Sequence, residues 1–178
     1  MPLLKHIEYP EIPFGNQSAY KDAWYLINQI FVRHFKNREL EEVLRLGFNI
    51  KESFIKLDPY FFKINNKMCC LCIDHCCINR HGFPDFEDLI IRRSLELPLL
   101  EYDFSAFDTD TCQFLGEKGC TLKRYERSYR CSWYFCDKVF DYYEKNDQEF
   151  FLTLEKELAH IGELRQKILK KFSQFFFK

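Results

Sequence analysis

The sequence predicts a mostly helical single domain with a few short β-strands, in which helices pack around a cysteine-rich centre. Apolar residues recur at three-to-four spacing near both ends of the chain, as in amphipathic helices. All nine cysteines of the 178 residues lie between positions 69 and 136. We therefore expect one domain, residues 1–178, with a helical N-terminal part over 1–58, a cysteine-rich core over 60–138 and a long C-terminal helix over 146–173.

Two helices are predicted in the N-terminal part. The first begins near Ser18, a suitable N-cap, and its apolar stripe runs to Phe35. The second begins at Asn37 and should end at Gly47, because glycine commonly terminates a helix in a left-handed conformation.

The middle of the chain reads as short elements. A turn at Pro59 should lead into an aromatic strand over 60–64. A helix should start at Pro84, where acidic residues follow, and end before Pro98. Alternating apolar and polar residues over 102–107 indicate a second short strand.

The C-terminal helix is the longest predicted element. From Asn146 onward, apolar residues recur on one face between Phe151 and Phe172, with charged residues on the other faces. The phenylalanine-rich end is expected to pack against the rest of the domain.

Composition and charge argue against several classes of protein. The 26 Lys and Arg are interspersed with 27 Asp and Glu, so nucleic acid is not an expected partner. Six glycines in the whole chain argue against a glycine-rich nucleotide loop. No stretch approaches the ~20 apolar residues of a membrane-spanning helix, and the N-terminus has no signal-type apolar run. We expect a cytoplasmic protein without a membrane span.

The clustering of the cysteines predicts a metal site. In a reducing compartment, clustered cysteines are more often metal ligands or redox groups than disulfide partners. In a helix or tight turns, Cys69, Cys72 and Cys76 would share one face, with Cys70 and Cys77 directed elsewhere.

A second group of cysteines extends the predicted site. Gly116 and Gly119 permit a chain reversal that returns Cys120 toward Cys112. Further on, Cys131 and Cys136 bracket three aromatic residues that would keep water from a bound metal. Basic residues lie alongside: Lys123, Arg124, Arg127 and Arg130. Thiolates suit both zinc and iron–sulfur clusters, and the choice stays open, although the aromatic surround favours iron–sulfur.

The order of these motifs resembles a known family. The runs are Cys69-x2-Cys72-x3-Cys76-Cys77, then Cys112-x-Phe114-Leu115-x3-Gly119-Cys120, then Tyr125-x-Arg127-x3-Cys131 followed by Cys136. Over residues 60–138 they resemble the cysteine-cluster family described as a zinc- or iron-chelating domain (YkgJ-like). A flagellin lysine N-methylase is similar to that family in the same region. In this chain the first motif is one residue longer, and Ser128 stands where the family has proline after arginine.

The resemblance implies a set of metal ligands. The candidates are Cys69, Cys72, Cys76, Cys77, Cys112, Cys120, Cys131 and Cys136. Cys70 is left out of this set. His75 and His81 flank the first cluster and are reserve ligands.

The leading functional expectation is a cytoplasmic metal-binding protein that holds an iron–sulfur cluster or zinc, with a role in structure, electron transfer or metal handling. One alternative is a protein-modifying enzyme of the lysine methyltransferase type that uses the cluster. If the protein is an enzyme, Cys131 is a candidate nucleophile, because the neighbouring Arg130 would lower its pKa. We favour metal ligation as the role of Cys131. A third possibility is a metal-stabilised interaction module that presents its C-terminal helix to a protein partner.

Overall fold

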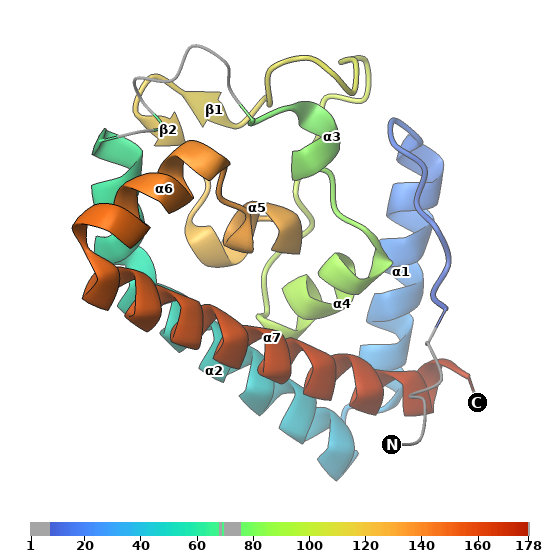
Figure 1. Ribbon diagram of the computed structural model, residues 1–178. Coiled ribbons are helices and arrows are strands. Elements are labelled where there is room, and N and C mark those ends of the chain that lie inside the picture. The colour runs from blue at the N-terminus through green and yellow to red at the C-terminus, as the bar shows by residue number, and fades with distance from the viewer. Residues whose placement is uncertain (1–7, 68, 70–75, 178) are drawn as a thin grey trace.

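The computed structural model describes residues 8–67, 69 and 76–177 and is mostly helical, as predicted (Figure 1). Its elements in chain order are α1 (Gln17–Arg33), α2 (Arg38–Lys67), α3 (Asn79–Gly82), α4 (Phe86–Ser94), β1 (Leu115–Gly116), β2 (Gly119–Cys120), the 3-10 helix η2 (Arg124–Glu126), α5 (Tyr129–Trp133), α6 (Asp137–Asn146) and α7 (Gln148–Phe176).

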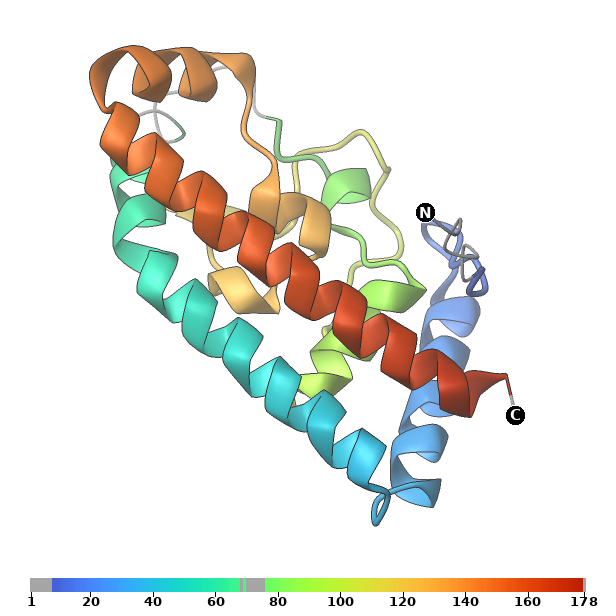
Figure 2. The same ribbon diagram turned by 60° about the horizontal axis from the view of Figure 1, so that its bottom comes forward.

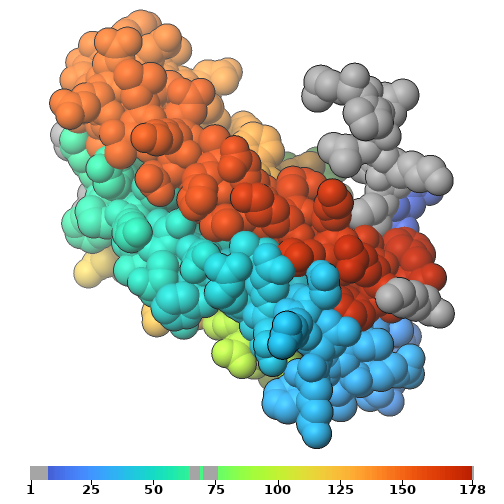
Figure 3. All heavy atoms as spheres, turned by 90° about the horizontal axis from the view of Figure 1, so that it is seen from below, coloured from blue at the N-terminus to red at the C-terminus, as the bar shows by residue number. Residues whose placement is uncertain are grey.

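The two long helices α2 and α7 lie side by side and run in opposite directions (Figures 1 and 2). Each carries a buried apolar stripe, with Ile50 and Leu57 on α2 and Ile161 and Ile168 on α7. Together they form one face of the molecule (Figure 3). Helix α4 packs against α1, α2 and α7, so the core lies between the helix pair and α1 and α4.

Helix α2 does not end at Gly47, so the predicted C-terminus there is wrong. The helix continues to residue 67 and includes Pro59 and the predicted strand over 60–64. Its buried stripe runs without a break through Phe61. Pro59 is exposed, which lets water bond the carbonyl that loses its helical partner. Gly47 instead serves packing, because a Cβ there would collide with the Ser94 carbonyl at the end of α4.

The remaining helix predictions differ in their boundaries. Helix α1 is capped by Asn16, whose side chain accepts from Ala19 N at 2.9 Å, rather than by Ser18. The predicted helix after Pro84 is confirmed as α4, with Asp85 as its N-cap in a capping box. The long C-terminal helix is confirmed as α7, and Phe172 is fully buried. Residues 102–107 form loop and turn rather than the predicted strand.

Within the described residues, β1 and β2 form a two-stranded sheet, which is a short antiparallel hairpin. Leu115 pairs with Cys120, and Gly116 pairs with Gly119. Gly119 has a φ of 98°, a conformation that glycine adopts without strain. The predicted chain reversal between Cys112 and Cys120 is therefore confirmed.

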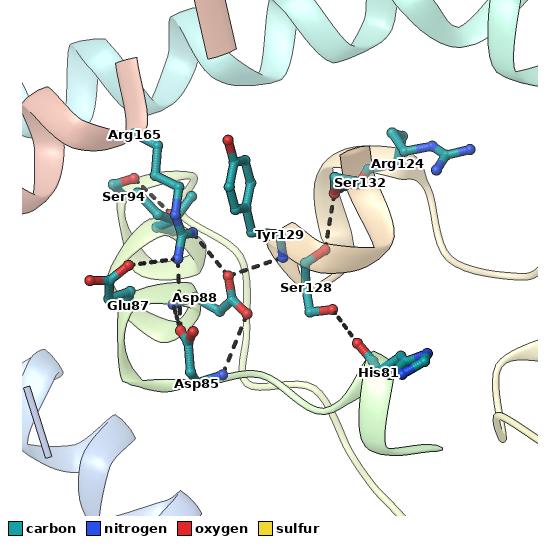
Figure 4. A network of polar contacts seen from close by, with 11 residues as sticks. His81, Asp85, Glu87, Asp88, Ser94, Arg124, Ser128, Tyr129, Ser132 and Arg165 are labelled. Atoms are coloured by element: carbon teal, nitrogen blue, oxygen red, sulfur yellow. Dashed lines mark hydrogen bonds and ion pairs between the residues drawn. The ribbon is translucent and has the colours of Figure 1, made fainter. Parts of the chain in front are cut away.

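A buried ion cluster joins α7 to the start of α4 (Figure 4). Arg165 is 5% exposed and contacts Asp88 at 2.9 Å, Glu87 at 3.1 Å and Asp85 at 3.7 Å. Asp88 also accepts a hydrogen bond from the Tyr129 amide at 3.0 Å, and the guanidinium lies over the Tyr129 ring. Burial raises the pKa of Asp88 to about 6, and Arg165 offsets part of that rise. The cluster thus fixes α4, α5 and α7 relative to one another.

We predict that Gly47→Ala destabilises the protein by about 1–3 kcal/mol, because the added methyl group must displace the backbone at Ser94. Helix propensity alone would favour alanine by about 1 kcal/mol, so the sign of the change is diagnostic. Urea unfolding measures it, with Glu52→Ala on the exposed face of α2 as the control. A stabilising Gly47→Ala would contradict the close approach of α2 and α4.

We predict that Arg165→Met lowers the free energy of unfolding by about 3–5 kcal/mol, because it leaves the Asp88 carboxylate buried without its cation. Lys171→Met is the matched control on the same helix. Lys171 also contacts two carboxylates, Glu39 and Glu42, but at the surface, where water screens the pair. Equal losses in the two variants would show that the ion cluster is not a buried anchor.

Candidate cysteine centre

Six cysteines from distant parts of the chain line one cavity of about 100 Å³. They are Cys69, Cys76, Cys77, Cys112, Cys120 and Cys131. Cys76 is exposed and the other five are half-buried, so the cavity opens near Cys76. Its remaining wall includes Ile64 near the end of α2, His81 in α3 and the hairpin residues Leu115 and Gly119.

Backbone pairing holds the two cysteine groups together. The Cys112 amide donates to the Cys77 carbonyl at 3.0 Å, and Ile78 and Thr111 form an antiparallel bridge beside them. The hairpin then places Cys120 opposite Leu115. The first and second cysteine groups, separated in sequence, therefore share one wall of the cavity.

The third contribution comes from α5, which packs against α3. The Cys131 thiol donates to the His81 carbonyl at 3.2 Å, and the Ser128 hydroxyl donates to the same carbonyl at 2.9 Å (Figure 4 shows the Ser128 bond). The Ser132 hydroxyl donates to the Ser128 carbonyl at 3.1 Å, which ties the turn before α5 to the helix. These bonds set the position of Cys131 relative to the first group.

The thiols raise one another's pKa values. The contact with Cys76 and then burial raise the pKa of Cys77 far above the ordinary thiol value. Burial raises the pKa of Cys112 and of Cys131, and the other sulfurs of the cavity add to both effects. Without a cation, these groups are therefore protonated at neutral pH. A bound metal ion reverses this balance, since it stabilises thiolates.

His81 also faces the cavity, and its ring is held by the backbone. Its Nδ1 lies 3.0 Å from the Cys76 carbonyl oxygen, which can only accept a hydrogen bond. In the tautomer with the proton on Nδ1, the lone pair of Nε2 is available to a metal ion. Metal-binding histidines are commonly held by such a bond, so His81 joins the candidate ligands.

Most of the basic and aromatic residues that the sequence placed near the thiols line the cavity, whereas Lys123 and Trp133 are not among its lining residues. Arg124, Arg127 and Arg130 line the cavity together with Tyr134 and Phe135. Phe135 stacks on the buried Phe61 of α2, with ring centroids 5.8 Å apart, and thereby closes one side. Of these three arginines, Arg124 is buried, and nothing in the sequence distinguishes it from the other two.

One of the predicted ligands among the described residues does not line the cavity. Cys136 is the N-cap residue of α6 and packs against the hydrophobic core; it is not among the cavity-lining residues. Cys72 and the flanking Cys70 and His75 lie outside the described residues, as does the predicted shared face of the first group. Within residues 8–67, 69 and 76–177, no group of three or more His, Cys, Asp or Glu side chains is already arranged to hold a metal ion.

In the metal-free protein, we predict that the free energy of unfolding falls as pH rises above the ordinary thiol pKa of 9.0. The folded chain holds the Cys112 and Cys131 protons to higher pH than the unfolded chain does. Their contribution is therefore complete below the unfolded pKa and lost as pH rises through the folded values. Urea unfolding between about pH 8 and about pH 10, with chelator and reductant, measures the slope. An equal slope in a Cys112→Ala, Cys131→Ala double variant would contradict the assignment.

Comparisons with known proteins found no match for this chain. No family model, curated protein or solved structure that was compared matches the chain. Among the described helices, none is long and apolar enough to cross a membrane. Support for a function therefore comes from the residues of the cysteine-lined cavity.

Proposed function

We propose that the cysteine-lined cavity binds a metal centre, either an iron–sulfur cluster or zinc, through cysteine thiolates. The observation that carries this proposal is the convergence of six cysteines, from three separate stretches of sequence, on one cavity. Buried cysteines that act only as small apolar residues have no reason to converge in this way. All-thiolate sets of this kind are typical of structural zinc sites and iron–sulfur clusters.

The surroundings of the thiols fit such a centre. Four thiolates with either zinc or a four-iron cluster carry a net charge of about −2, which needs nearby donors or cations. Arg124 and Arg127 supply two positive charges on the cavity wall, whereas Arg130 lines the cavity but is exposed, so that water screens its charge. Tyr134 and Phe135 also line the cavity, and aromatic side chains there would limit the access of water to a bound centre and influence the potential of a redox centre.

The candidate ligands of the proposed centre come from several segments of the chain. Cys112 precedes the hairpin, Cys120 lies in β2 and Cys131 in α5, and the first group adds Cys69, Cys76 and Cys77, with His81 as a further candidate. The bound centre would supply a cross-link between these short segments and, for iron–sulfur, a one-electron carrier. Because no described group is arranged around one ion, binding would include rotation of the side chains toward a common point and would stabilise the middle of the chain.

This proposal implies a reducing location such as the cytoplasm, because thiols and not disulfides bind metal. The proposed role of the centre is structure, electron transfer or metal handling. In each case the chain's own residues bind the centre and exclude water.

We predict that Cys120→Ser and Cys131→Ser each lower the metal content and the melting temperature of the anaerobically purified protein, because each removes a thiolate ligand. Elemental analysis gives the metal, and a broad absorbance at about 400 nm distinguishes iron–sulfur from colourless zinc. Full metal content in both variants would contradict the ligand assignment. Metal-free wild-type protein, even after reconstitution, would contradict the function.

Cys136→Ser serves as the matched comparison, because this half-buried cysteine is outside the cavity lining. Retention of the metal in that variant limits the ligands to the cavity. Loss of the metal extends the ligand set to Cys136, as the family resemblance implies.

A further inference from the structure

Arg124 is a buried cation on the wall of the cysteine cavity. The residue is 6% exposed and lies in η2. Its Nη1 donates to the Cys131 carbonyl at 2.8 Å, and its guanidinium carbon lies 3.6 Å from the centre of the Phe61 ring. Its Nε is buried and has no hydrogen-bond partner among the residues that the structure describes. One donor of a fully buried charged group is therefore unused.

Comparison with Arg165 shows what Arg124 lacks. The two side chains are equally buried, yet Arg165 contacts three carboxylates. The ion pairs among the described residues include none with Arg124. Burial and then repulsion by Arg127 lower the pKa of Arg124 to about 9. A buried cation of this kind destabilises the fold unless an anion or a strong acceptor accompanies it.

Among the described residues, the groups next to Arg124 that can supply the missing negative charge are sulfurs. Cys120, Cys131 and Cys69 are the neighbours whose ionised forms attract the Arg124 guanidinium. As neutral thiols they offer it no charge. As metal-bound thiolates they would carry a net negative charge, together with sulfur lone pairs that accept hydrogen bonds.

We propose that Arg124 is the counter-cation of the thiolate-bound centre and donates its unused Nε–H hydrogen bond to that centre. The inference rests on the proposed function. Arg124 would favour the metal-bound (loaded) state of the protein over the metal-free (empty) state. Arg124 is a positioning residue, since it is not itself a ligand. Its charge opposes folding of the empty protein and supports binding of an anionic thiolate complex.

This role makes the effect of substitution differ between the two states. Arg124→Met keeps an unbranched side chain over Phe61 but removes the charge and the donors. The empty protein loses a buried unpaired charge, so its melting temperature should stay the same or rise. The loaded protein loses its counter-ion, so its metal affinity should fall. If Arg124 had only a structural role, its substitution would lower the stability of the metal-free and the metal-bound protein by the same amount.

The experiment uses Zn²⁺ as the probe, in competition with a chelator at fixed pH, on the full chain under reducing conditions. We expect Arg124→Met to weaken Zn²⁺ binding about 10- to 100-fold, the usual effect of removing an outer-shell partner. Arg124→Lys should retain most of the affinity, because it keeps the charge. Arg130→Met is the matched control: Arg130 lines the same cavity but is exposed, so its loss should change the affinity much less.

Two results would overturn the role of Arg124 and leave the proposed function intact. One is a loss of Zn²⁺ affinity in Arg124→Met no larger than in Arg130→Met. The other is an equal fall in melting temperature with and without the metal. If Arg124→Met does not fold, Arg124→Gln allows the same comparison of charge. Wild-type protein that neither competes with the chelator for Zn²⁺ nor takes up an iron–sulfur cluster on anaerobic reconstitution would instead overturn the metal-binding function, and the role of Arg124 with it.

Discussion

The antiparallel packing of α2 against α7 is the constraint on which the rest of the molecule depends. These two helices bury long apolar stripes against each other, whereas most of the elements between them have two to five residues. Such short segments cannot bury enough apolar surface to be stable alone. Residues 76–136 are therefore placed by their contacts with the framework. The close approach at Gly47 and the ion cluster of Arg165 are two of these contacts.

Polar contacts connect that framework to the cysteine cavity. Arg165 of α7 bonds Asp88, and Asp88 accepts from the Tyr129 amide at the start of α5 (Figure 4). The neighbouring Ser128 donates to the His81 carbonyl, and the His81 ring contacts the Cys76 carbonyl. The walls of the cavity are thus tied to the long helices on one side. Binding of a metal at the cavity would tie the same segments together on the other.

The two buried arginines, Arg165 and Arg124, differ in how their charges are balanced. Arg165 has its carboxylates within the fold, so its charge is balanced whatever the state of the cysteines. Arg124 has a backbone carbonyl and an aromatic face, neither of which balances a full charge. Burial of an arginine is thus a structural feature in one place, and in the other it fits the anionic centre that we propose.

The sequence by itself determined the helical class, the course of α4 and α7, the grouping of the cysteines and the chain reversal between Cys112 and Cys120, because each depends on local spacing, caps and turn residues. Tertiary structure decided the rest. Gly47 and Pro59 end helices by local propensity, yet α2 continues through both, since its apolar stripe packs on α7. Likewise, the four basic residues Lys123, Arg124, Arg127 and Arg130 look equivalent in sequence. Only the packing of η2 against Phe61 buries Arg124 and leaves Arg130 exposed, because burial is set by contacts between distant segments.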